Sequence, residues 1–113
     1  MSRSVNLALQ CVAVGLPEPQ TEYRFDPDRR WKFDLAYPEL KLGIEIEGGI
    51  WMQTSAGRSK GHAHPSRFLS DIEKYNKAAI LGWRLLRFTP QMVEDGTALA
   101  TIEKALGKVS QSV

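Results

Sequence analysis

The chain has 113 residues, of which 42% are hydrophobic and 25% charged, a composition typical of one globular domain with a modest core. No apolar run approaches the roughly 20 residues of a membrane span, and the N-terminus carries no cleavage signature, so we expect neither a membrane partner nor secretion. The single cysteine, Cys11, excludes an internal disulfide and favours a reducing, cytoplasmic location.

The first predicted element is a helix that begins at Ser4, its N-cap, and ends near Val14, before Gly15. Cys11 on this helix is expected to be a small buried hydrophobe. The predicted buried stripe consists of three apolar residues: Val5, Leu9 and Val12.

Three short strands are predicted next, over residues 22–25, 31–37 and 42–47. Side chains alternate between the two faces of a strand, so Asp34 on the second strand shares a face with Lys32 and Ala36, opposite the apolar residues of that strand. On the third strand, Glu45 and Glu47 likewise share a face. A hairpin of these strands brings three carboxylates together, and like charges at that distance are costly without a cation. The pattern therefore predicts a metal site.

A loop is predicted over residues 51–65, followed by a helix from Pro65 to Leu81, a strand over 83–88 and helices over 90–94 and 97–106. The predicted buried stripe of the longer helix is apolar: Phe68, Ile72, Tyr75 and Ala79. A helix that connects the third strand to the fourth favours parallel pairing of these two strands. We therefore predict a single α/β (α+β) domain over residues 1–113, with a central mixed four-stranded sheet flanked by helices.

Basic residues are concentrated after the acidic hairpin. Seven lysines and arginines lie between Arg58 and Arg87, against only Asp71 and Glu73. A polyanion that also needs a divalent cation would suit both segments, whereas the alternative is a solvated basic helix face.

Five blocks of the sequence together resemble the PD-(D/E)XK nuclease superfamily, most closely its small phage-encoded and very-short-patch-repair-like endonucleases. The blocks are residues 23–25, 30–36, 43–49, 71–76 and 82–88. The resemblance implies a restriction-endonuclease-like αβββαβ core and a metal-dependent DNA endonuclease that hydrolyses phosphodiester bonds. Nicking, mismatch or junction selectivity in phage DNA processing, repair or recombination would follow, in a bacterial or phage-infected cell.

The same resemblance implies the roles of individual residues. Asp34 and Glu45 would ligate Mg²⁺, for which Mn²⁺ should substitute, together with the backbone carbonyl of Ile46. The third position of the motif is usually lysine but is Glu47 here. Glu47 itself, Lys74 and His62 are therefore the candidates for proton transfer and charge stabilisation.

Six residues are predicted to contact DNA: Arg30, Trp51, Arg58, Lys60, Arg67 and Lys77. Trp51 follows Gly48 and Gly49 and would stack on a distorted DNA step, with packing in the core as its alternative. A homodimer would explain paired cuts by so small an enzyme.

Several alternatives remain open at the level of the sequence. The chain could be a nucleic-acid-binding module that keeps the fold without cleaving, which the missing lysine favours, or an unrelated acid-pair hydrolase such as a glycosidase. Asp71 and Lys74 could form a simple surface pair. Glu22 could join the acidic cluster or form a surface salt bridge with Arg24 or Arg30. His62 and His64 could suggest zinc, but soft partner ligands are lacking.

Overall fold

The computed structural model describes residues 2–48 and 65–107, and for residues 65–67 the backbone alone. The helices are α1 (Arg3–Ala13), α3 (Pro65–Ile80), α4 (Pro90–Glu94) and α5 (Thr97–Ala105), with a short 3-10 helix, η1 (Pro38–Leu40). The strands are β1 (Gln20–Arg24), β2 (Lys32–Tyr37), β3 (Leu42–Ile46) and β4 (Arg84–Phe88). None of the described helices is long and apolar enough to cross a membrane.

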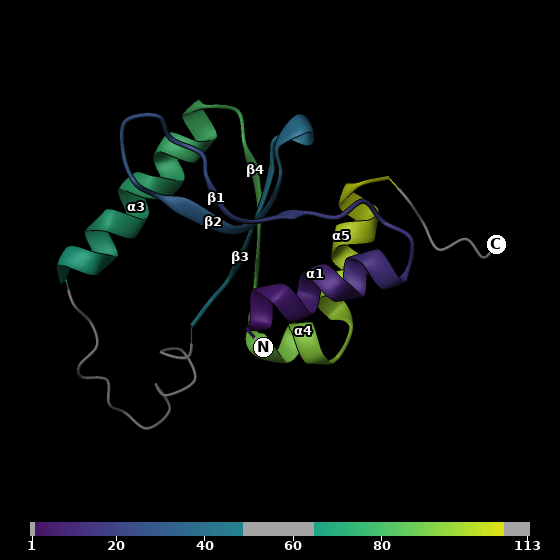
Figure 1. Cartoon of the computed structure of the whole chain (residues 1–113). Coiled ribbons are helices and arrows are strands. Elements are labelled where there is room, and N and C mark those ends of the chain that lie inside the picture. The colour runs from purple at the N-terminus through teal and green to yellow at the C-terminus, as the bar shows by residue number, and fades with distance from the viewer. Residues whose placement is uncertain (1, 49–64, 108–113) are drawn as a thin grey trace, which may run out of the picture.

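The four strands form one mixed sheet in the order β1-β2-β3-β4. β1 pairs antiparallel with β2, and β2 with β3, while β3 and β4 are parallel. Helices α1, α4 and α5 lie on one side of this sheet, and α3 lies on the other (Figure 1). The predicted α/β (α+β) class, the mixed four-stranded sheet with flanking helices, and the αβββαβ order are confirmed.

The side covered by α1, α4 and α5 contains the main apolar core. Its buried members come from all three helices and from the sheet, and they include Leu7, Cys11, Leu35, Leu42, Ile44, Val93 and Ile102. Cys11 is fully buried, as expected for a small hydrophobe. Burial of this aliphatic surface is the main force that holds these helices on the sheet.

The side covered by α3 contains a smaller, aromatic cluster. Phe25 stacks on Phe33 with ring centroids 4.1 Å apart, and Trp83 meets Phe33 edge-on at 5.1 Å. From α3 itself, Ala78 is buried in this cluster and Leu81, just beyond the helix end, is partly buried. The apolar contribution of α3 is therefore small.

The predicted buried stripe of α3 is wrong at three of its four positions. Phe68 is 65% exposed, Ile72 and Ala79 are also exposed, and Tyr75 is half-buried. The helix instead turns the side of Lys74, Lys77 and Ala78 toward the sheet. The physical reason is that two buried acids, described below, require partners from this helix.

The predicted stripe of α1 is also wrong. Val5, Leu9 and Val12 are each at least 40% exposed, while Leu7, Ala8 and Cys11 are buried. Apolar residues occur around much of this helix, so its amphipathic pattern did not identify one face. The helix also begins earlier than predicted, because Ser2 is the N-cap and its hydroxyl accepts a hydrogen bond from the Val5 N–H.

The expected alternation along β2 breaks at Asp34. Leu35 packs in the main core, whereas Phe33 and Ala36 both pack in the aromatic cluster on the α3 side. The break lies opposite Glu22 of β1, whose φ of 48° is left-handed. The Phe33 ring then lies across β3 at Gly43, where a Cβ atom would come within 2.5 Å of it. Glycine is required at this position because the ring occupies the space of a side chain.

Candidate functional site

The candidate site begins where β2 and β3 diverge. The pairing between these strands runs from Tyr37–Leu42 to Leu35–Ile44. Beyond it, the Oδ2 atom of Asp34 accepts a hydrogen bond of 2.7 Å from the Ile46 backbone N–H. The Asp34 carboxylate thus satisfies a donor that the partner strand no longer reaches. Asp34 and Ile46 also line a pocket of about 170 Å³ with Arg3 and Ser4 at the start of α1.

Glu45 turns toward α3 and forms a buried ion pair. The Nζ atom of Lys74 lies 2.7 Å from its Oε2 atom, and the two side chains are only 13% and 12% exposed. The structure therefore pairs Lys74 with Glu45, whereas Asp71, the surface partner considered from the sequence, is exposed. Lys74 places a positive charge beside a predicted metal ligand, although it comes from a helix distant in sequence from that strand.

Glu47 is held by an arginine of the neighbouring strand. The Nε atom of Arg87 donates to Glu47 Oε2 at 2.7 Å, and the guanidinium carbon lies 4.8 Å from the ring centroid of Tyr75. Arg87 is also the register partner of Glu45 in the parallel β3–β4 pair. Two of the three predicted acids, Glu45 and Glu47, therefore each pair with a cation of the same chain.

Burial disfavours the charged forms of Asp34 and Glu45 in spite of the nearby cation Lys74. Burial raises the pKa of Glu45 to about 7, against the lowering effect of Lys74, and the charges of Asp34 and Glu47 raise it further. Burial also raises the pKa of Asp34, against the Ile46 hydrogen bond, and the charge of Glu22 adds to the rise. The hydroxyl pKa of Tyr75 is raised by burial and by Glu45 and Glu47. Burial is therefore the largest cause of these raised pKa values, and the neighbouring carboxylates add to it.

The donor set suits a hard divalent cation. Asp34, Glu45 and the Ile46 carbonyl supply oxygen atoms only, as Mg²⁺ prefers, and such a site commonly keeps several waters. Within residues 2–48 and 65–107, no group of three or more His, Cys, Asp or Glu side chains gathers as a metal site. The predicted set is smaller, because it consists of two side chains and one backbone oxygen, and its chemistry fits the cation.

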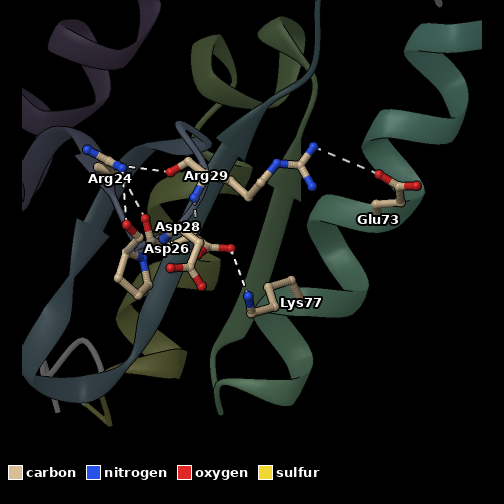
Figure 2. Close-up of polar contacts among 7 residues, drawn as sticks. Arg24, Asp26, Asp28, Arg29, Glu73 and Lys77 are labelled. Carbon is tan, nitrogen blue, oxygen red and sulfur yellow. Dashed lines mark hydrogen bonds and ion pairs between the residues drawn. The ribbon is translucent and has the colours of Figure 1, made fainter.

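A second buried acid, Asp26, forms an ion pair with Lys77, the lysine that follows Lys74 on α3 (Figure 2). Asp26 follows β1, its side chain is fully buried, and its Oδ2 atom lies 3.2 Å from Lys77 Nζ. Its Oδ1 atom accepts hydrogen bonds from the N–H groups of Asp28 and Arg29. Burial alone would raise the pKa of Asp26, but these donors and Lys77 hold it below the ordinary value. Lys77, predicted to contact DNA, thus has a structural partner.

Other contacts support the turn after β1. Arg24 donates to the carbonyl oxygens of Asp26, Pro27 and Arg29, and Arg29 reaches to 3.9 Å from Glu73 on α3 (Figure 2). The Arg29 guanidinium also lies 3.9 Å from the Trp31 ring centroid. The Arg24 contacts close the turn, and the exposed Arg29–Glu73 pair links it to α3.

The remaining predicted residues are distributed as follows. Arg30 is exposed on the turn after β1. Glu22 lies 3.5 Å from Lys32, not from the arginines considered as partners. Arg67 belongs to α3, but its side chain is not described, and four predicted site residues lie outside the described residues: Trp51, Arg58, Lys60 and His62.

Two residues of the site were not predicted as such. Arg87 was counted only within the basic segment, although its position one residue before the end of a strand parallel to 42–47 could have indicated its proximity to Glu45. Arg3 borders the pocket beside Asp34, and no pattern in the sequence places the start of the first helix there.

The comparisons with known proteins identify two relatives. The chain is 30% identical over 83 residues to Uncharacterized protein MT2308 and to Uncharacterized protein Rv2248, from the CDC 1551 / Oshkosh and ATCC 25618 / H37Rv strains of Mycobacterium tuberculosis. The match covers 72% of this chain but only 26% of each relative, so the chain spans about a quarter of their length. No protein-family model matches the chain, and no solved structure does. The resemblance to PD-(D/E)XK nucleases therefore stays a prediction.

Proposed function

We propose that the chain is a metal-dependent DNA endonuclease of the PD-(D/E)XK type. The observation that carries the proposal is that the Asp34 carboxylate bonds the backbone N–H of Ile46, the residue that follows Glu45, whose side chain forms the buried pair with Lys74. Two acids on strands that diverge, with a cation from α3 beside one of them, are suited to phosphodiester hydrolysis.

The proposed roles follow from the contacts. Asp34 and Glu45 would hold Mg²⁺ or Mn²⁺ together with the Ile46 carbonyl, and the bound ion would supply Lewis acidity and an activated water. Lys74 holds Glu45 at 2.7 Å and keeps a positive charge beside the ligands. The Ile46 N–H orients the Asp34 carboxylate. His62 and the predicted DNA contacts at Trp51, Arg58 and Lys60 remain part of the proposal.

A binding module without cleavage is the second candidate. It is favoured by the two ion pairs, because Lys74 and Arg87 already neutralise two of the three acids without a metal. Such a protein would bind DNA in a salt-dependent manner and leave the backbone intact.

One experiment separates the two candidates. The purified protein is incubated with Mg²⁺ or Mn²⁺ and with supercoiled, linear, mismatched and four-way-junction DNA. We expect metal-dependent cleavage of at least one substrate, its loss in Asp34→Ala, and its retention in Glu39→Ala, which removes an exposed acid at the other end of the hairpin. DNA binding without cleavage under either metal would support the second candidate instead.

Location and assembly belong to the same proposal. The buried Cys11 thiol, whose pKa is raised by burial, suits a reducing cytoplasm of a bacterial or phage-infected cell. Paired cuts would be made by a homodimer, and the molecular mass of the protein in solution with and without DNA tests this assembly.

A further inference from the structure

We propose that Arg87, oriented by Glu47, contacts the phosphate of the bond to be cleaved and supplies the charge of the lysine expected at position 47. The inference rests on the proposed nuclease function and names a substrate-contacting residue of that site. Glu47 then acts as a positioning residue and not as the general base.

Arg87 lies on the face from which a lysine at position 47 would project. The β3–β4 register puts it beside Glu45, on the face that meets α3. A lysine at position 47 would project from the same face two residues along β3, because side chains alternate along a strand. The acid at position 47 therefore removes a positive charge from this face, and the neighbouring strand restores one.

Glu47 and Tyr75 together orient the Arg87 guanidinium. Its Nε atom donates to Glu47 Oε2 at 2.7 Å, and its carbon lies 4.8 Å from the Tyr75 ring centroid. A hydrogen bond and a ring contact together restrict a side chain that would otherwise have many rotamers. The guanidinium is thus held in position before a substrate arrives.

The exposed part of the guanidinium can contact a substrate. Arginine has five N–H donors in a planar fork. Within residues 2–48 and 65–107 the guanidinium donates through Nε alone, so its two terminal nitrogens can make a bidentate contact with phosphate oxygens. The Arg87 side chain is 51% exposed, whereas Lys74 is 13% exposed and already bonded to Glu45. Of these two cations, Arg87 is the one open to a substrate.

The main test compares Arg87→Gln with Arg84→Gln, which removes an exposed arginine from the other end of the same strand. We expect Arg87→Gln to lower kcat/KM about 10- to 100-fold, as for loss of a charge-assisted hydrogen bond, and Arg84→Gln to change it less than threefold. Arg87→Lys should recover only part of the loss, because an ammonium cannot hold Glu47 and the phosphate in the same fork geometry.

A double-mutant cycle separates positioning from base catalysis. If Glu47 acts through Arg87, Glu47→Gln should lower kcat/KM less than Arg87→Gln does, and the double variant should be no worse than Arg87→Gln alone. If Glu47 is the general base, its loss should dominate, flatten the pH–rate profile and add to that of Arg87→Gln. The second pattern would overturn the positioning role.

A binding measurement keeps the inference independent of cleavage. DNA affinity is measured without metal over a range of salt concentrations, for the same variants. Loss of one phosphate contact should reduce the slope of log K against log salt by about 1 in Arg87→Gln but not in Arg84→Gln. If the unmodified protein cuts no DNA, the proposed function fails, and this slope still decides the phosphate contact. Equal slopes and equal kcat/KM in the two variants would overturn the inference.

Discussion

On one side of the sheet, α1, α4 and α5 bury aliphatic side chains such as Leu42, Ile44 and Ile102. On the other side, α3 presents Lys74 and Lys77 to the buried acids Glu45 and Asp26 and leaves Phe68 and Ile80 exposed. Apolar burial stabilises the first side without specific partners, whereas a buried ion pair gains little net free energy from its desolvated charges. The second side therefore depends on specific charge partners in addition to its smaller aromatic cluster.

The largest effect on stability is expected in the aliphatic core. Ile102→Ala removes a fully buried side chain and should lower the free energy of unfolding by about 2 to 5 kcal/mol. The same substitution on α3, Ile80→Ala, should change it by less than about 0.5 kcal/mol, because that side chain is 78% exposed. Urea unfolding of both variants measures the difference, and equal losses would contradict the described contrast between the two sides.

An intermediate effect is expected at Gly43. The Cβ atom of Gly43→Ala would collide with the Phe33 ring, so the variant should lose about 1 to 3 kcal/mol of stability. Phe33→Leu combined with Gly43→Ala should lose less than the sum of the two single changes, because the smaller side chain leaves room for the methyl group. Thermal or urea unfolding checks this prediction, and strict additivity would argue against the close approach.

A smaller effect is expected from pH. Since the pKa of Glu45 is raised to about 7 from its ordinary 4.5, the folded state binds more protons than the unfolded state between these values. The free energy of unfolding should therefore decrease as the pH rises through this window, by at most about 1.4 kcal/mol per pH unit. Asp34, whose pKa is also raised, acts in the same direction.

Urea unfolding at pH 5 and pH 7.5 measures this dependence in the protein and in Glu45→Gln. The variant cannot titrate at this position, so its stability should vary less with pH than that of the unmodified protein. An unchanged pH dependence would show that Glu45 is not the group responsible.

The local sequence patterns correctly predicted the helices and strands and their order. They did not predict which face of α1 and α3 is buried. Gly15 and Gly82, both with φ of 89°, follow the ends of α1 and α3 as predicted, and the crossover between β3 and β4 gives the expected parallel pair. The inward face of α3 depends on Glu45 and Asp26, which lie far upstream in the sequence, so no helical periodicity could identify it. Because these acids are buried, the lysines that pair with them determine which face of α3 turns toward the sheet.

The candidate site was predicted only in part, because its contacts also depend on residues that are distant in sequence. Asp34, Glu45 and Glu47 were identified from strand spacing, and Lys74 was a candidate to replace the lysine that is missing at the third position of the motif. Alternation predicted one face for all three acids, but the break of β2 at Asp34 places its carboxylate at the Ile46 N–H, beside Arg3 and Ser4. Arg87 was missed because its importance depends on the register of two strands that are 40 residues apart.

Metal binding tests the central claim most directly, because it requires no knowledge of the DNA substrate. Calorimetric titration with Mn²⁺ at pH 7.5 is carried out on the unmodified protein, Asp34→Asn, Glu45→Gln and, as a control, Glu39→Gln. We predict binding by the protein and the control, and an affinity at least about tenfold lower in each of the other two variants, since each loses a charged ligand. No binding by the unmodified protein, or equal affinity in all four proteins, would contradict a metal site at Asp34 and Glu45.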